Sequence, residues 1–425
     1  MISRKRTTIW VCVVLFITVV ILLFLKQYYG MPYYDKYSSY YINLELVLNS
    51  LNNGITIDTI RGNNHGPLFL IILGHLGHVL NISDAAMVSY VFQFIIVALS
   101  ITVLSTVLFI MSEGNMILSL IMYIIIMRLS LLYIYIEPSA KYSYWGGMAF
   151  DFLCIPLVIY IMYLKERDGN VSEFGMLMVI LGLMSLGNII RQHSAFPTLV
   201  VTMFMLLVLL FKEKKRWKIV LGEMVLSIVS FIYIPPLCKW IYDKLIGIID
   251  VQTVERPWHG IWCGLGVYNN PYGFEWNDEV AAEYVRSVNE LVGYCTNEYF
   301  DILKERVLYV LKEDPVWVIG VYYNKFLDSI KLCMENQWTA ALIILFLTFV
   351  TGIISKVLLI KIDYYAFSGI MFCILGILAG MIQGVIGYPV IPYILPGIGC
   401  LSLLYIFGIF NILLFINRLL LKRKV

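Results

Sequence analysis

The sequence predicts an all-α protein that crosses a membrane about ten times, with both chain ends in the cytoplasm. Three observations support this fold class. Charged residues make up only 14% of the chain and the mean hydropathy is +0.83, whereas soluble domains carry about a quarter charged residues. Apolar residues form runs long enough to span a bilayer as helices, which takes about 20 residues. Both chain ends are basic, and basic residues mark the cytoplasmic side.

The first apolar run covers residues 9–25 and follows the basic residues 4–6. A signal peptide begins in the same way, but residues 26–29 (Lys-Gln-Tyr-Tyr) stand where a cleavable signal would have small residues. We therefore expect a retained anchor helix.

Nine further runs are apolar enough to cross the membrane: 86–111, 115–136, 145–164, 173–190, 195–211, 218–240, 339–360, 364–384 and 393–416. A shorter stretch at 67–80 is interrupted by glycine and histidine residues. Two cytoplasmic ends require an even number of crossings, which ten runs satisfy and an eleventh would break. We therefore expect 67–80 to form an interfacial helix on the outer leaflet.

With ten crossings, the outer face holds two large segments, the first external segment 26–85 and the segment 241–338. The second reads as a small helical cap inserted into a single membrane domain that covers residues 1–425. Apolar residues over 280–292 and 299–311 keep a helical period, and Asp314-Pro315 has the residue order that opens a helix. Cys263 and Cys295 share this cap, where a disulfide and two free thiols are both open readings.

Polar side chains gather on the predicted outer face, while the cytoplasmic loops hold little besides basic residues. Ionisable groups are costly at membrane depth, so their clustering indicates a site. A net charge of +3 gives no indication of a nucleic-acid partner. The P-loop, Rossmann, HExxH and GxSxG motifs are absent from the sequence. We therefore expect an outward-facing site of another kind.

Asp35 lies soon after the first crossing, in a stretch rich in aromatic residues. A partly shielded carboxylate can act as a general base, and a solvated acid paired with Lys36 is the alternative. Arg191 and His193 stand at a helix junction that faces outward. They suit the binding of an anionic phosphate. Alternatively, their side chains only extend to the polar interface of the membrane.

Histidines are the candidate metal ligands of the first external segment. His75 and His78 are three residues apart on one face of the expected interfacial helix, which permits metal ligation but does not require it. His65, before Gly66-Pro67, either contributes to chemistry or only orients a loop. The sequence leaves the cofactor open, with a divalent metal possible and not required.

The anchor helix is followed by Asp35 with three tyrosines at 37, 40 and 41, by residues 44–54, and by His65-Gly66-Pro67-Leu68. This order resembles the GT-C membrane glycosyltransferases. Within them it is most similar to the protein mannosyltransferase and aminoarabinose transferase group, glycosyltransferase family 39 and its bacterial relatives. The likeness covers about the first half of the chain. Lys36 stands where many members have a second acid, and Gly66 replaces a proline of the family motif.

The resemblance implies transfer of a sugar from a polyprenyl-phosphate donor to a glycan, lipid or protein acceptor. The reaction would take place on the outer face of the cytoplasmic membrane of a bacterium, among membrane lipid. Asp35 would be the general base. Donor phosphate would be bound by Arg61, His65, Arg191 and His193. Four further residues are possible secondary members of the site: Tyr34, Lys36, Glu45 and Lys141. The acceptor-side candidates are Trp258, His259, Trp262 and Tyr272.

The alternative is a polytopic transporter, or a flippase or polymerase for lipid-linked glycans, without this transferase activity. A transporter is expected to show broken helices in repeated halves. Pro235-Pro236 and the glycines and prolines at 387–396 are expected to break helices, but no repeat pairs them.

Overall fold

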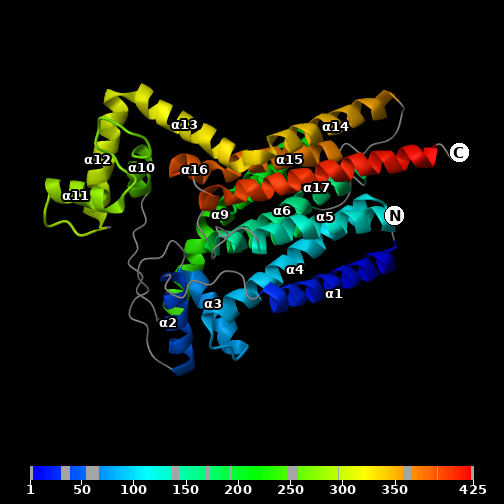
Figure 1. Ribbon diagram of the computed structural model, residues 1–425, viewed down its shortest axis with the longest axis horizontal. Helices are drawn as coiled ribbons and strands as arrows, with labels where there is room; N and C mark the ends of the chain where they lie inside the picture. Colours follow the sequence, from blue (N-terminus) through cyan, green and yellow to red (C-terminus); the bar gives the residue numbers. More distant parts are fainter. Residues whose placement is uncertain are drawn as a thin grey trace. The chain divides into compact units, whose positions relative to one another are not determined.

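The computed structural model describes residues 3–29, 39–53, 67–135, 143–167, 173–190, 194–246, 257–294, 296–357, 365–389 and 391–422. Regular secondary structure in these residues is helical, without a strand. The chain divides into two compact units (Figure 1). Unit 1 is formed by Met1–Asp250, Asn336–Ala379 and Pro396–Val425, and unit 2 by Val251–Glu335 and Gly380–Leu395.

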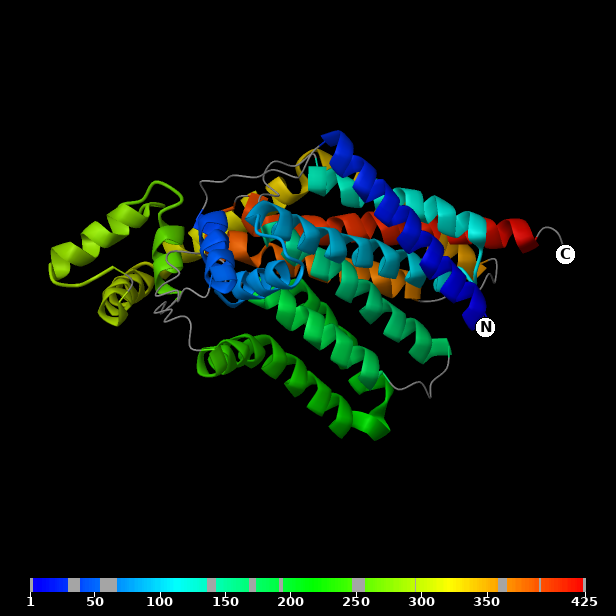
Figure 2. The ribbon, with the colours of Figure 1, turned by 90° about the horizontal axis from the view of Figure 1, so that it is seen from below.

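Unit 1 is a bundle of long apolar helices. Its helices are α1 (Arg4–Tyr29), α2 (Ser39–Asn53), α3 (Pro67–Val79), α4 (Ala85–Met111), α5 (Met116–Tyr135), α6 (Ser143–Arg167), α7 (Phe174–Ile190), α8 (Phe196–Lys212), the 3₁₀ turn Lys214–Arg216, α9 (Trp217–Ile246), α14 (Trp338–Val357), nearly all of α15 (Tyr365–Gly380) and most of α17 (Ile391–Lys422). In Figure 2, α1 (blue) lies along one edge of this bundle and α9 (green) along the other.

Among the described residues, six helical stretches are long and apolar enough to cross a membrane: Arg4–Gln27, Ala85–Met111, Lys214–Cys238, Trp338–Val357, Gly369–Ile386 and Tyr393–Leu420. Each of the ten predicted runs contains a helix. Two of these helices, α7 and α8, have 17 residues each and reach about 26 Å, somewhat less than a hydrocarbon core of about 30 Å. The chain is therefore an all-α, multi-pass membrane protein, while ten crossings and cytoplasmic ends stay predictions.

The interior of unit 1 is closely packed, and its margin is apolar and exposed. A Cβ atom added at Gly376 of α15 would lie 2.7 Å from the Cys400 sulfur of α17, so these two helices approach closely. On the margin, Trp10 of α1 stacks on Phe109 of α4 with ring centroids 4.9 Å apart. Away from this contact, α1 exposes Phe16 and similar residues, as expected of a helix that faces lipid.

Two short helices follow α1 in the segment predicted to be external. The helix expected over 67–80 is present as α3, and α2 is a further helix that the sequence pattern did not predict. A Cβ atom at Gly74 of α3 would lie 2.3 Å from a methyl group of Val47 on α2, and one at Gly77 would lie 2.6 Å from Leu48. The missing side chains at these glycines therefore allow α2 and α3 to pack against each other.

Unit 2 is a small helical unit with its own core. It contains α10 (Trp258–Leu265), α11 (Asp278–Val288), α12 (Asn297–Glu313), α13 (Pro315–Met334) and α16 (Ile382–Ile386), and the 3₁₀ turn Glu335–Gln337 leads from α13 to α14. The core joins residues of α10 to α13: Trp262, Leu265, Phe274, Ala281, Val285, Tyr299, Leu303, Val310, Val318 and Val321. This unit overlaps the segment 241–338 expected as a cap and adds Gly380–Leu395.

Of two helix features predicted in this unit, one is confirmed and the other is shorter than expected. The start at Asp314-Pro315 is confirmed, because the Asp314 side chain accepts a hydrogen bond from the Trp317 amide at 3.0 Å and Pro315 begins the helix. The helical period expected over 280–292 extends only to Val288. Asn289 has an extended backbone and ends α11, and Leu291 beyond it is exposed.

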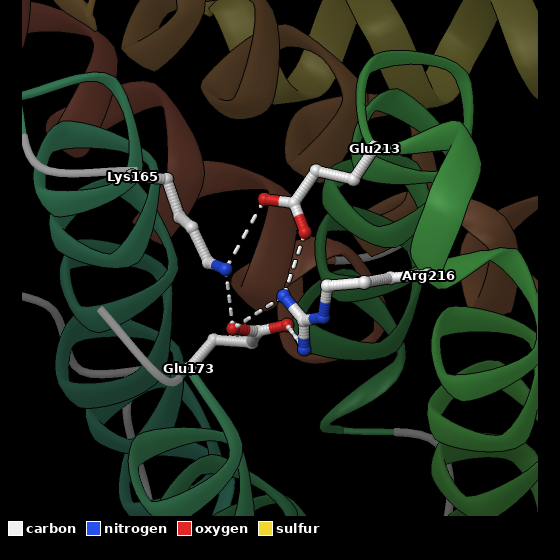
Figure 3. A network of polar contacts seen from close by, with 4 residues as sticks. All are labelled: Lys165, Glu173, Glu213 and Arg216. Atoms are coloured by element: carbon white, nitrogen blue, oxygen red, sulfur yellow. Dashed lines mark hydrogen bonds and ion pairs between the residues drawn. The ribbon is translucent and has the colours of Figure 1, made fainter. Parts of the chain in front are cut away.

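Charged residues at helix ends that are predicted to lie on the same side of the membrane meet in unit 1. Lys165, at the end of α6, lies 2.6 Å from Glu173 and 3.1 Å from Glu213, and Arg216 lies 2.8 Å from Glu173 (Figure 3). Burial raises the pKa of Glu173, but hydrogen bonds from Arg216 and Lys165 outweigh this effect and leave that pKa below its ordinary value. The network therefore ties the end of α6 and the start of α7 to the segment between α8 and α9 through charged pairs.

Candidate functional site

The predicted donor side of the site lies mostly outside the described residues. This applies to the candidate base and to all four phosphate-binding candidates: Asp35, Arg61, His65, Arg191 and His193. It applies also to three of the secondary candidates, Tyr34, Lys36 and Lys141. Their roles stay predictions.

The described part of the first external segment places Glu45 on the exposed surface of α2. His78, near the end of α3, has its Nδ1 atom 2.9 Å from the Asn52 side-chain oxygen of α2. His75 is half-buried on the same helix. A side-chain amide is a poor metal ligand. The hydrogen bond between His78 and Asn52 therefore connects α3 to α2 and does not form part of a metal site.

The four acceptor-side candidates all lie in unit 2, and they differ in exposure. Trp262 is 1% exposed, and its ring packs at 5.2 Å against Phe274 and at 6.1 Å against Tyr284. Its faces are occupied by the core, so this ring offers no free surface for a sugar. Trp258 is half-buried, and the Lys304 ammonium lies 5.7 Å from its ring centre.

Tyr272 is held at the junction between α12 and α13. Its hydroxyl donates a 2.8 Å hydrogen bond to Asp314, and its ring lies 4.8 Å from that of Trp317. The hydrogen bond to the Asp314 carboxylate raises the pKa of Tyr272. The tyrosine is thus positioned by the same aspartate that caps α13, and it is half-buried.

His259 contacts three polar groups, two of which the sequence analysis did not single out. Its Nδ1 atom lies 2.8 Å from the Tyr299 hydroxyl, and its Nε2 atom lies 3.0 Å from Asp278. The Cys263 sulfur lies 3.7 Å from the same Nε2 atom. Burial raises the pKa of the Cys263 thiol to about 12, and the Asp278 charge acts in the same direction. Cys263 has a free thiol, and Cys295 lies outside the described residues.

A second group of aromatic residues lies where α16 meets the rest of unit 2. Trp276 stacks on Tyr388 with ring centroids 5.2 Å apart and meets Tyr393 edge-on. Tyr268 donates a short hydrogen bond to Asp328, and its pKa is raised by burial and by that carboxylate. Trp276 is exposed and the three tyrosines are half-buried. Accessible aromatic rings beside a carboxylate are groups that sugar-binding surfaces use, so this group joins Trp258 and Tyr272 as a candidate acceptor surface.

Lys325 of α13 is a buried cation that the sequence did not reveal. Its side chain is 0% exposed, and its ammonium donates to the carbonyl oxygens of Gly264, Ile386 and Gly387 at 2.8 to 3.0 Å. The ring of Tyr322 lies 4.5 Å from the same nitrogen. Burial lowers the pKa of Lys325 to about 7.

Two acids are buried inside the apolar helices of unit 1. Asp151 of α6 is 0% exposed, and one of its oxygens accepts a 2.6 Å hydrogen bond from Thr198 of α8. The other oxygen bonds no group among the described residues, and neither carboxylate oxygen of Glu223 on α9 does. Single acids within apolar runs are visible in the sequence, so that signal could have found both.

Comparison of the chain with protein-family models, with curated proteins and with solved structures found no match in any of the three.

Proposed function

We propose that this protein is a membrane glycosyltransferase that moves a sugar from a polyprenyl-phosphate donor to an acceptor on the extracytoplasmic face. The acceptor hydroxyl loses its proton to Asp35 as its oxygen attacks the anomeric carbon. The bond from that carbon to the phosphate oxygen breaks, and polyprenyl phosphate leaves. Arg61, His65, Arg191 and His193 would stabilise the charge on the leaving phosphate.

The observation that carries the proposal is the order and packing of the first external segment. Asp35 comes just before α2 and His65 just before α3, and these two helices pack against each other through Gly74 and Gly77. The packing fixes the helices that follow the candidate base and the candidate phosphate ligand. The long apolar helices of unit 1 supply the surface that the donor's polyprenyl tail requires.

The second candidate function is transport, and the buried acid Asp151 favours it. A carboxylate within a membrane helix, with one oxygen left unbonded by the described residues, is a typical feature of proton or substrate pathways. The hydrogen bond from Thr198 also gives Asp151 a structural role. The buried acid therefore supports transport less strongly than the order and packing of the first external segment support sugar transfer.

Purified protein offered a panel of radiolabelled polyprenyl-phosphate sugars tests the proposal. We expect turnover of one donor, and a loss of about 10²-fold or more in Asp35→Asn with donor binding retained. Glu113→Gln is the matched control, because it removes an exposed carboxylate from the turn between α4 and α5. A folded protein that binds no donor would contradict the proposal. Flux of lipid-linked sugar across proteoliposomes without sugar transfer would favour transport instead.

A further inference from the structure

Three side chains of unit 2 direct metal-binding atoms at one point. His259 and Cys263 are four residues apart on α10, so they lie on the same face of that helix. Asp278, the first residue of α11, lies beside them. The His259 Nε2, the Cys263 sulfur and a carboxylate oxygen of Asp278 all lie within 4.8 Å of one another. We propose that these three side chains bind a zinc ion.

The distances among the three atoms suit tetrahedral zinc. They are 3.0 Å from nitrogen to oxygen, 3.7 Å from sulfur to nitrogen and 4.0 Å from sulfur to oxygen. Ordinary zinc bond lengths at tetrahedral angles give about 3.4, about 3.5 and about 3.6 Å for the same pairs. Shifts of about 0.4 Å, within reach of side-chain rotation, therefore bring all three ligands to bonding distance.

The orientation of the imidazole distinguishes a metal site from a catalytic triad. In a cysteine–histidine–aspartate triad, one ring nitrogen faces the sulfur and the other faces the carboxylate. Here the Cys263 sulfur and the Asp278 oxygen both lie near Nε2 of His259. Convergence of the sulfur and the carboxylate oxygen on the same ring nitrogen suits a shared cation, because a metal can bond all three groups at once.

The other nitrogen of His259 is held in the way that metal-binding histidines require. Its Nδ1 lies 2.8 Å from the hydroxyl of Tyr299, a core residue of α12 that is 1% exposed. A hydrogen bond from Nδ1–H to an outer partner fixes the tautomer with its free lone pair on Nε2. Tyr299 is therefore the positioning residue of the site.

The ligand set indicates the ion and the form of the site. Nitrogen, sulfur and oxygen together suit zinc, whereas magnesium and calcium prefer oxygen ligands alone. Cys263 is buried, but the Asp278 side chain is 76% exposed, so the fourth position opens toward solvent. Binding replaces the thiol proton of Cys263 with zinc and releases that proton to water.

Zinc at this point would connect α10 to α11. The inference is independent of the proposed transferase, because it needs no donor, acceptor or Asp35. It gives His259 a different role from that of an acceptor-side residue, since its Nε2 lone pair would be occupied. A hydrogen-bonded His–Asp pair beside an ordinary core cysteine is the competing explanation, and it predicts no metal binding.

The test uses the full-length protein in detergent, stripped of metal with a chelator and titrated with Zn²⁺ against a chromophoric competitor. We expect one zinc per chain, and Co²⁺ in its place to give a near-ultraviolet thiolate-to-metal absorption band. Cys263→Ala should abolish the band and weaken zinc binding at least 100-fold. Tyr299→Phe should weaken it about 10- to 100-fold. Cys333→Ala, which removes another buried thiol of unit 2, should change neither measurement.

Asp278→Asn keeps the test decisive if Cys263→Ala does not fold, because this side chain is exposed and its removal leaves the core intact. Its zinc affinity should fall at least 10-fold, with the helical circular dichroism unchanged. Folded wild-type protein that binds less than one zinc per chain would overturn the proposal. Equal affinities for Cys263→Ala and Cys333→Ala would overturn it as well.

Discussion

At the scale of single residues, Lys325 connects three parts of unit 2 through one nitrogen. Its acceptors are near the carboxyl ends of α10 and α16, where helix carbonyl groups lack partners within their own helices. An ammonium has three hydrogens to donate, so the protonated form satisfies all three carbonyls. Against this, burial disfavours the charge and lowers the pKa of Lys325 to about 7.

This pKa predicts how the stability of the protein depends on pH. The unfolded chain keeps the lysine proton up to its ordinary pKa of 10.5, whereas the folded chain loses it near pH 7. The unfolded state thus binds more protons between these values, and the free energy of unfolding rises with pH there by at most about 1.4 kcal/mol per pH unit. Lys325→Met should remove this contribution.

Thermal unfolding midpoints in detergent from pH 7 to 10 check the prediction. The advantage of the wild type over Lys325→Met should grow with pH. Lys331→Met, at an exposed position of the same helix, should follow the wild type. Parallel curves for wild type and Lys325→Met would show that the lysine does not titrate in this range.

At the scale of elements, the contact between α2 and α3 depends on a glycine. A methyl group at Gly74 would overlap the Val47 side chain at 2.3 Å. We expect Gly74→Ala to lower the stability by about 1–3 kcal/mol through overpacking, although alanine is otherwise the better helix former. The unfolding midpoint in detergent measures the effect.

A double-mutant cycle separates the two helices' contact from other effects. Val47→Ala in the Gly74→Ala background should restore part of the stability, because the two changes affect one contact. Gly182→Ala in α7 is the control, since a methyl group there meets nothing within 4 Å. Additive effects of the two substitutions would mean that α2 and α3 do not approach at this point.

How far the sequence predicts these elements depends on whether the signal is local. Apolar runs and the Asp314-Pro315 cap are local, and the structure has helices at each. The contact of His259 with Asp278 joins residues 19 positions apart, and tertiary packing alone brings them together. Lys325 lies in an amphipathic helix where nothing in the neighbouring sequence indicates burial. Trp262 was expected as an accessible ring, but its apolar neighbours made it a core residue.

At the scale of the whole molecule, the crossing number determines which groups share a side. Ten crossings would place unit 2 outside and the charged network of Lys165, Glu173, Glu213 and Arg216 inside. Alkaline phosphatase, active only outside the cytoplasm, should work when inserted at Gly293 and fail when fused after Val425. A fluorescent reporter should give the opposite result at each position.

The same reporters decide whether α3 crosses the membrane. Truncated fusions after Asn53 and after Asn81 flank that helix. Phosphatase activity at both positions is expected for an interfacial α3. Activity after Asn53 alone would mean that α3 spans the bilayer and that every later segment changes side.

Unit 2 consists of two stretches of chain separated by α14 and α15. A recombinant fragment that ended at Glu335 would retain only the Gly264 acceptor of the three that Lys325 uses, and Trp276 would lose Tyr388 and Tyr393. Producing this unit apart from the membrane therefore calls for a designed linker that joins Glu335 to Gly380. A fragment that ended at Glu335 would lack Gly380–Leu395 and would expose the surface of unit 2 that these residues cover.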